Sequence, residues 1–259
     1  MEYYLNSIIM FVKSEMEYRA SFIINMMASA ITTLTAVLGI VFLIQKFGAV
    51  GGWSTEEVML TTGIAIFGHT LTEIILQGFN HLHLKVKTGA LDQMMVRPRG
   101  MLFQVMCSDF QISKIGRLIE SIALMTYGLS KVSIIWTPYK LLVFIIILIG
   151  VNILFASLLI LKAAFCFWTI DGMELMNILQ EGGRDLSSYP ISIYNEKFAK
   201  FFTFIVPFGM INYFPLMYLL DKGDAPFWYG LTPIATIPFM IVMLIIWRIG
   251  LRNYKSTGS

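Results

Sequence analysis

The sequence predicts an all-helical membrane protein with six transmembrane helices, and three observations carry this prediction. Charged residues make up only 14% of the 259 residues, whereas hydrophobic residues make up 57% and the mean hydropathy is +0.73. An ordinary soluble domain has about 25% charged residues. The apolar residues are gathered into long stretches, and most Lys and Arg residues fall on one side of them. We therefore treat residues 1–259 as one transmembrane domain.

Six stretches are long enough to cross a bilayer as helices, because about 20 mostly apolar residues span ~30 Å of hydrocarbon. In chain order they are residues 22–44, 58–79, 115–135, 141–167, 201–220 and 231–251. In the third stretch, Arg117 and Glu120 are expected to form an interfacial pair near its start. The fifth is interrupted by Pro207 and Pro215, which weaken a helix.

The distribution of basic residues predicts how the chain is oriented. With the N-terminus in the cytoplasm, the few basic residues on the outer side are Lys46, Lys131, Lys140 and Lys222. All the others, including Arg184, Lys197 and Lys200, then lie on the inner side. Cytoplasmic loops carry an excess of Lys and Arg, so both termini are predicted to be cytoplasmic.

Two segments outside the six stretches have helical patterns. Residues 1–21 mix apolar side chains with Lys13, Glu15 and Glu17, which predicts an amphipathic helix lying in the membrane interface. Residues 168–200 are expected to link the fourth and fifth spans in the cytoplasm. Within them we expect a short helix that stops at the Gly182-Gly183 pair.

Several function classes lack the residues that they need. The net charge is only +3, which gives no support for a nucleic-acid partner, and no phosphate-binding loop or metalloprotease motif is present. Cys107 and Cys166 fit neither a disulfide framework nor a zinc site. The acidic residues Asp171, Glu174, Glu181 and Asp185 allow two interpretations, a metal patch or a solvated face, and we favour the solvated face. We expect this chain to bind no metal or cofactor.

The segment between the second and third spans carries the most information. Gly89 can end the helix that continues the second span, and a short apolar pattern follows it, ending at Pro98 and Gly100. A short transverse helix with exposed Met and flanking Arg suits docking into a groove of another protein. A basic loop that touches lipid headgroups is an equally good interpretation of the spacing alone.

Here the chain resembles a known family. Thr88-Gly-Ala-Leu-Asp92 followed by Arg97-Pro98 is similar to the G-x-L-D-x-x-L-x-R-P segment of ABC-2-type permeases, the six-span membrane subunits of bacterial ABC exporters. One branch of that family also has Y-P-x-x-I-Y and P-F-x-x-x-x-Y-x-P segments, which resemble Tyr189–Tyr194 and Pro207–Pro215. The end of the chain, Arg252 to Gly258, is similar to that branch as well.

The resemblance implies a non-catalytic permease in a bacterial cytoplasmic membrane. It implies two permeases, identical or paired with a close relative, on two cytoplasmic ATPase subunits that carry ATP and Mg²⁺. The residues that would contact the ATPase are Gly89, Leu91, Asp92, Arg97, Pro98 and Arg99. The implied function is ATP-driven export of an amphiphilic, drug-like or lipid-like substrate by alternating access. None of the soluble pieces could bury a core, which also points to an energy source on another chain.

Polar and aromatic residues within the spans are candidates for a substrate path or gate. His69 and Glu73 lie four residues apart and can pair on one helix face; a structural hydrogen bond is the alternative. The fifth span offers Phe204, Phe208 and Tyr213 beside Pro207 and Pro215, with packing and lipid contact as the alternative.

Two other functions stay open at this point. An ion-coupled carrier would often show internal repeats, and none is visible. A membrane-embedded lipid-modifying enzyme would need clustered acids or histidines at the interface, and only the scattered acidic set above is present.

Overall fold

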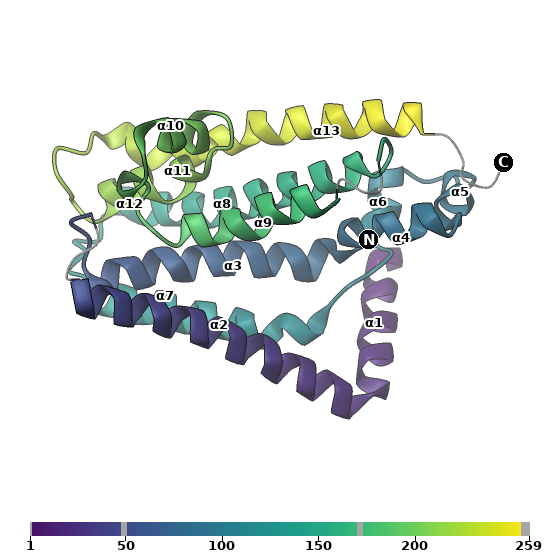
Figure 1. The fold of residues 1–259 in the computed structure, drawn as a ribbon, viewed down its shortest axis with the longest axis horizontal. Helices are drawn as coiled ribbons and strands as arrows, with labels where there is room; N and C mark the ends of the chain where they lie inside the picture. Colours follow the sequence, from purple (N-terminus) through teal and green to yellow (C-terminus); the bar gives the residue numbers. More distant parts are fainter. Residues whose placement is uncertain (1, 48–50, 170–172, 255–259) are drawn as a thin grey trace.

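The computed structural model describes residues 2–47, 51–169 and 173–254, and these residues form helices joined by loops, with no strand among them (Figure 1). The α-helices up to the middle of the chain are α1 (Glu2–Glu17), α2 (Arg19–Phe47), α3 (Thr55–Asn80), α4 (Leu82–Lys87), α5 (Ala90–Met95), α6 (Met101–Met106), α7 (Ile115–Lys131) and α8 (Pro138–Phe165). The later ones are α9 (Met173–Ser187), α10 (Glu196–Phe204), α11 (Phe208–Ile211), α12 (Tyr213–Leu219) and α13 (Thr236–Asn253). Short 3-10 helices are η1 (Ile112–Lys114), η2 (Ile191–Ile193) and η3 (Phe227–Ala235).

The expected all-helical membrane fold is confirmed. Four described helical stretches are long and apolar enough to cross a bilayer: Arg19–Phe42, Thr55–Lys87, Pro138–Phe165 and Phe227–Asn253. A bent pair, Glu196–Phe204 with Phe208–Leu219, makes a fifth if it counts as one span. The third predicted span corresponds to α7, which has 17 residues. The count of six spans therefore stays a prediction.

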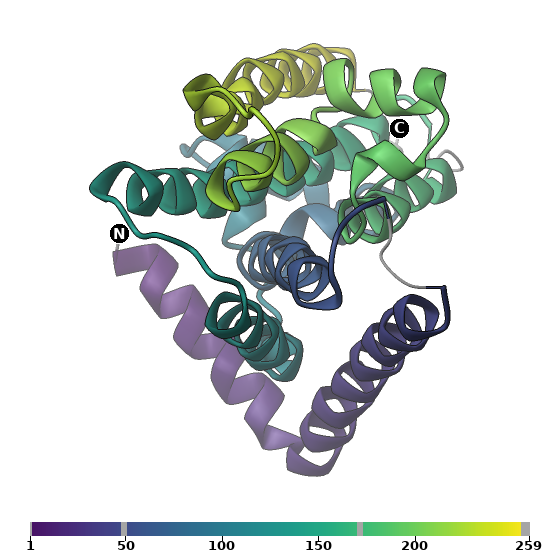
Figure 2. The same ribbon diagram turned by 90° about the vertical axis from the view of Figure 1, so that its left-hand side faces the viewer.

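Helix α3 is the centre of the bundle, and Figure 2, seen from one end of the bundle, places it between the other long helices. It packs mainly against α7 and α8, and most of its length is buried. Its start is fixed by a capping box, in which Ser54 and Glu57 each accept a hydrogen bond from the other's backbone N–H. By contrast, α2 and α13 expose rows of large apolar side chains, as helices that face lipid do.

The segments around Trp53, Lys140 and Lys222 connect the predicted spans on the side predicted to be external, and they meet at one end of the bundle, which we call the outer-loop end. There, Lys222 Nζ lies 2.7 Å from a Glu57 carboxylate oxygen and 4.8 Å from the centre of the Trp53 ring. Lys140 Nζ pairs with Asp221 at 2.6 Å. These contacts join the residues at the starts of α3, α8 and η3, which is consistent with the prediction that all three lie on one side of the membrane.

Helix α1 lies across the bundle axis at the opposite end (Figure 1), as an interfacial helix would. The Glu15 carboxylate accepts hydrogen bonds from the backbone N–H groups of Ile112 and Ser113, both at 3.1 Å. This contact ties α1 to the residues that lead into α7.

The fifth predicted span, 201–220, is not one straight helix. The chain bends by 70° between α10 and the α11–α12 pair. Pro207 stands at the N-cap of α11, three residues after α10 ends, which fits the interruption that proline predicts. Pro215 lies within the first turn of α12, where a proline is tolerated.

The prediction of a cytoplasmic link over 168–200 is wrong for its described part. Helix α9 packs alongside α3 and α8 (Figure 1), and by η2 the chain has reached the outer-loop end. There, a Cβ built on Gly51 would lie only 2.9 Å from Cγ2 of Ile193. Lys197 and Lys200, on α10, therefore lie at the end opposite to the one expected for them.

The expected stop at Gly182-Gly183 is also wrong, since α9 continues to Ser187. The reason is a close approach: a Cβ built on Gly183 would lie 2.1 Å from Cζ of Phe208, whereas nothing lies within 4 Å of one built on Gly182. Gly183 thus allows the buried ring of Phe208 to pack against α9. Packing therefore explains Gly183, and neither glycine ends the helix.

Candidate functional site

Two groups of residues are candidates for function: the segment 89–99, at the end of the bundle opposite to the outer-loop end, and a charged cluster between the helices. The segment, which we call the coupling segment, begins at Gly89. Gly89 has φ +69° and ψ 3°, the left-handed conformation that glycine adopts without strain, and it separates α4 from α5. The left-handed turn redirects the chain after α4, as the sequence predicts.

The coupling segment has an anchored side and an exposed tip. Leu91 is fully buried and Met94 nearly so, and both belong to a core cluster with Phe79 and Trp247. Val96 is 84% exposed. The residues that follow it, Arg97, Pro98 and Arg99, are exposed as well. Of the predicted ATPase contacts, Leu91 therefore anchors the segment, and the basic tip is the part that a partner can reach.

This segment is attached to the longest candidate membrane span among the described residues. Helices α3 and α4 together run from Thr55 to Lys87 and join the outer-loop end to the coupling segment. Leu76, with φ −112° and ψ 24°, departs from helical geometry and marks a kink within that stretch. The coupling segment is therefore connected to the central helix through α4 and this kink.

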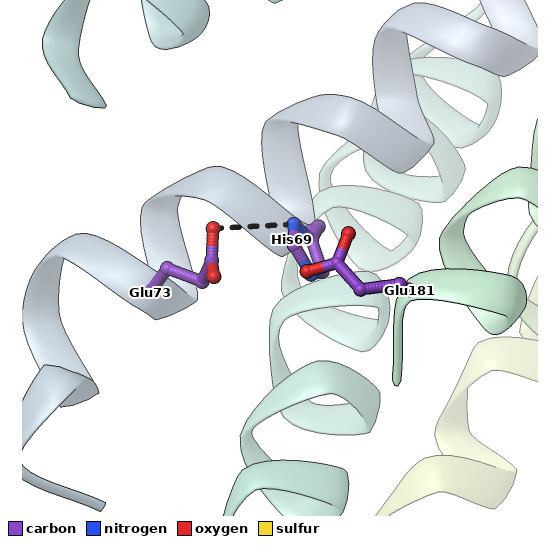
Figure 3. A group of neighbouring side chains, drawn as sticks. All are labelled: His69, Glu73 and Glu181. Atoms are coloured by element: carbon purple, nitrogen blue, oxygen red, sulfur yellow. Dashed lines mark ion pairs between the residues drawn. The ribbon is translucent and has the colours of Figure 1, made fainter. Parts of the chain in front are cut away.

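The charged cluster is centred on Glu73, which is buried in α3. Its carboxylate lies 2.7 Å from Lys114 Nζ and 3.5 Å from Arg117 Nη1. His69 Nδ1 lies 3.4 Å from Glu73 Oε2, which fits the predicted pairing of these two residues (Figure 3). A buried carboxylate is costly unless it is paired, and here two cations of the η1–α7 region pair with it.

His69 connects the cluster to two further helices. Its Nε2 atom lies 3.5 Å from Gln180 Nε2 and 3.7 Å from Glu181 Oε1, both on α9. Its ring meets Phe155 of α8 edge-on, with 5.1 Å between the ring centres. Glu181 in turn pairs with Arg184 Nη1 at 2.8 Å. The cluster thus consists of His69, Glu73, Lys114, Arg117, Glu181 and Arg184.

His69, Glu73 and Glu181 could offer three ligand atoms to a cation, all within 4.8 Å of one another. Both carboxylates, however, already pair with cationic side chains, Glu73 with Lys114 and Glu181 with Arg184. Lys114, Arg117 and Arg184 would repel a metal ion at this position. The geometry therefore favours a network of ion pairs that holds α3, α7 and α9 together.

The sequence predicted only part of this cluster. The spacing of four residues identified His69 and Glu73, because such pairs share a helix face. Arg117 was expected to pair with Glu120, but it lies within ion-pair distance of Glu73 instead. The contacts of Glu73 with Lys114 and of His69 with Glu181 join residues far apart in the chain. No local sequence pattern could therefore predict these contacts.

The aromatic candidates do not form one surface. Phe208 is buried, whereas Phe204 is 71% exposed and lines a pocket of about 350 Å³ with Tyr194 and Phe214. The Tyr213 ring lies 5.8 Å from that of Trp53 at the outer-loop end. These side chains therefore face different surroundings, and the structure does not join them into a single path.

Comparison with known proteins gives one finding. A family model described as "ABC-2 family transporter protein" matches residues 30–258, nearly the whole chain. No curated protein and no solved structure matches the chain significantly.

Proposed function

The chain belongs to the ABC-2 family of transporter proteins and is a membrane permease component of an ABC transporter, and on this premise we propose that it moves an amphiphilic substrate out of the cytoplasm or inner leaflet. The energy comes from two separate ATPase subunits in the cytoplasm, which hold ATP and Mg²⁺. The working unit has two permeases, either two copies of this chain or this chain with a close relative, in a bacterial cytoplasmic membrane.

The coupling segment carries this proposal. Its exposed basic tip is available to a partner, and its buried anchor, Leu91, connects it to the core around α3 and α8. Closure of the ATPase pair pushes the tip, and the α3–α4 stretch passes the movement toward the outer-loop end. This chain needs no catalytic residue for that task, because phosphoryl transfer takes place on the ATPase.

The test is co-purification with an ABC ATPase encoded beside this chain. In the wild type we expect a stable complex whose ATPase activity responds to the permease. Arg97→Glu reverses a charge at the exposed tip and should abolish both co-purification and the response, and Asp92→Ala should weaken them. Arg252→Glu is the matched control, because Arg252 is an exposed arginine at the last turn of α13 and lies outside the coupling segment.

The control should behave as the wild type does. Transport by the purified chain with no nucleotide-binding partner would contradict the proposal. Transport driven by a proton gradient alone would indicate an ion-coupled carrier.

A further inference from the structure

A pocket of about 460 Å³ lies beside the charged cluster, between α2, α3, α7 and α9. The side of the lining that comes from α2 and α3 includes Val37, Ile40 and Ile66, which we call the apolar wall, together with Thr32, Thr33 and Thr62. The side that comes from α7 and the end of α9 carries Arg117, Arg184 and Asp185, with Ser188 and Tyr189 beside them. The site therefore joins a charged wall to an apolar wall within helices of the membrane bundle.

Arg117 is the unsatisfied group of this pocket. Its Nε atom is buried and has no hydrogen-bond partner in the described structure. The contact of its Nη1 with Glu73 is long, at 3.5 Å, and Lys114 already holds that carboxylate at 2.7 Å. A buried donor without a partner costs about 1–3 kcal/mol, and more when the group is charged.

The other charges of the pocket are paired within α9. Arg184 donates to Asp185 Oδ1 from Nε and Nη2, at 3.0 and 2.8 Å, and its Nη1 pairs with Glu181. The one carboxylate of the lining is thus engaged by its neighbour. The group that the pocket offers to a ligand is mainly the guanidinium of Arg117. An anionic ligand would complement the positive charge of this guanidinium.

We propose that this pocket binds an amphiphile with an anionic phosphate-type headgroup, the headgroup on Arg117 and the tail along the apolar wall. Guanidinium groups bind phosphate oxygens through paired, charge-assisted hydrogen bonds. The apolar wall distinguishes this ligand from a free anion, which would leave that wall uncovered. The inference rests on the proposed function in that it names the chemical class of the permease's substrate.

The test uses the full chain, purified in a neutral detergent without an ATPase and examined by native mass spectrometry. Phosphatidylglycerol, phosphatidylcholine and a cationic trimethylammonium lipid with the same tails are offered in equal amounts. We expect phosphatidylglycerol to be retained about tenfold more than either other lipid, the ratio given by ~1.4 kcal/mol from a charge-assisted contact.

Two variants test the two walls. Arg117→Gln should reduce the ratio of retained phosphatidylglycerol to phosphatidylcholine to about one. Val37→Phe fills the apolar wall, leaves Arg117 in place, and should lower the retention of phosphatidylglycerol. The matched control is Lys131→Gln, which removes an exposed charge from the far end of α7 and should leave the ratio unchanged. Thermal unfolding of each variant is measured to show that it is folded. If Arg117→Gln fails to fold, the retention of phosphatidylglycerol by Val37→Phe still tests the proposal.

The inference is overturned if the wild type retains all three lipids equally, if the cationic lipid is preferred, or if folded Arg117→Gln keeps the selectivity. Displacement of the lipid by inorganic phosphate would show that the site binds a free anion, and would overturn the proposal that its ligand is an amphiphile. Co-purification of Arg117→Gln with the ATPase is measured separately, because Arg117 lies outside the coupling segment. Loss of lipid selectivity and loss of ATPase binding can therefore be told apart.

Discussion

At the scale of single residues, Glu73 is a buried carboxylate that has several charged partners. Its side chain is 5% exposed and lies close to Lys114, Arg117 and His69. Ionisable groups within a membrane are expensive and are kept in pairs. The pairing of His69 with Glu73 could be predicted from their spacing, whereas the cations could not, because they come from a part of the chain that only the fold brings near.

Replacing Glu73 with Gln should destabilise the protein strongly. The substitution keeps the size of the side chain but removes the Glu73 carboxylate from Lys114 and Arg117, whose side chains are only 17% and 15% exposed. Breaking a buried pair by removing one partner costs about 3–5 kcal/mol. The measurement is the free energy of unfolding of the purified chain in detergent.

The control for this variant is Glu196→Gln. Glu196 pairs with Lys200 at 2.6 Å, but the two side chains are 80% and 67% exposed. An exposed pair contributes ~0–1 kcal/mol, so this variant should unfold almost as the wild type does. Equal stability of the two variants would show that the cluster does not hold the bundle together.

The adjacent glycines of α9 give a second matched pair. Gly183→Ala places a methyl group against the Phe208 ring and should destabilise the protein by about 1–3 kcal/mol. Gly182→Ala meets open space on an exposed helix face and should stabilise it by up to ~1 kcal/mol. Thermal unfolding of both variants measures which of them is more stable. The account of α9 packing is wrong if Gly183→Ala is more stable than Gly182→Ala.

At the scale of elements, α9 shows where sequence reasoning reached its limit. Its helical pattern and its amphipathic character are visible in the sequence. The pattern identifies one face as apolar, but it does not say whether water or other helices surround the rest. Because α9 is poor in apolar residues, hydropathy placed it in the cytoplasm, whereas the packing of Met176, Gln180 and Ser187 buries one face among its neighbours.

Helix α1 gives a prediction at the same scale. Glu15→Ala removes the acceptor of two backbone hydrogen bonds, from Ile112 and Ser113. We expect these two amides to exchange with deuterium about tenfold faster or more, since a hydrogen bond to a charged group contributes ~1.5–3 kcal/mol. Glu17→Ala, at an exposed position of the same helix, should not change their exchange. Equal exchange in both variants would mean that α1 is not fastened to the start of α7 in solution.

At the scale of the whole molecule, the fold class could be predicted well because it depends on long apolar stretches, which are visible in the order of the residues along the chain. The number and course of the spans could not, because α7 is short and the segment after α9 is bent. The coupling segment could be located because Gly89 and the tip Arg97-Pro98 leave a local signature. The pocket beside Arg117 could not be located, since its walls come from α2, α3, α7 and α9.

The account as a whole requires the coupling segment to face the cytoplasm, where an ATPase can cover it. The most direct measurement is labelling of Val96→Cys with a membrane-impermeant maleimide. Val96 is 84% exposed, and the native Cys107 and Cys166 are buried. Asp224→Cys, in an exposed loop at the outer-loop end, serves as the opposite marker. We predict that Val96→Cys is labelled only in inside-out vesicles and is protected when the ATPase binds, whereas Asp224→Cys is labelled in intact cells; labelling of Val96→Cys in intact cells would contradict the account.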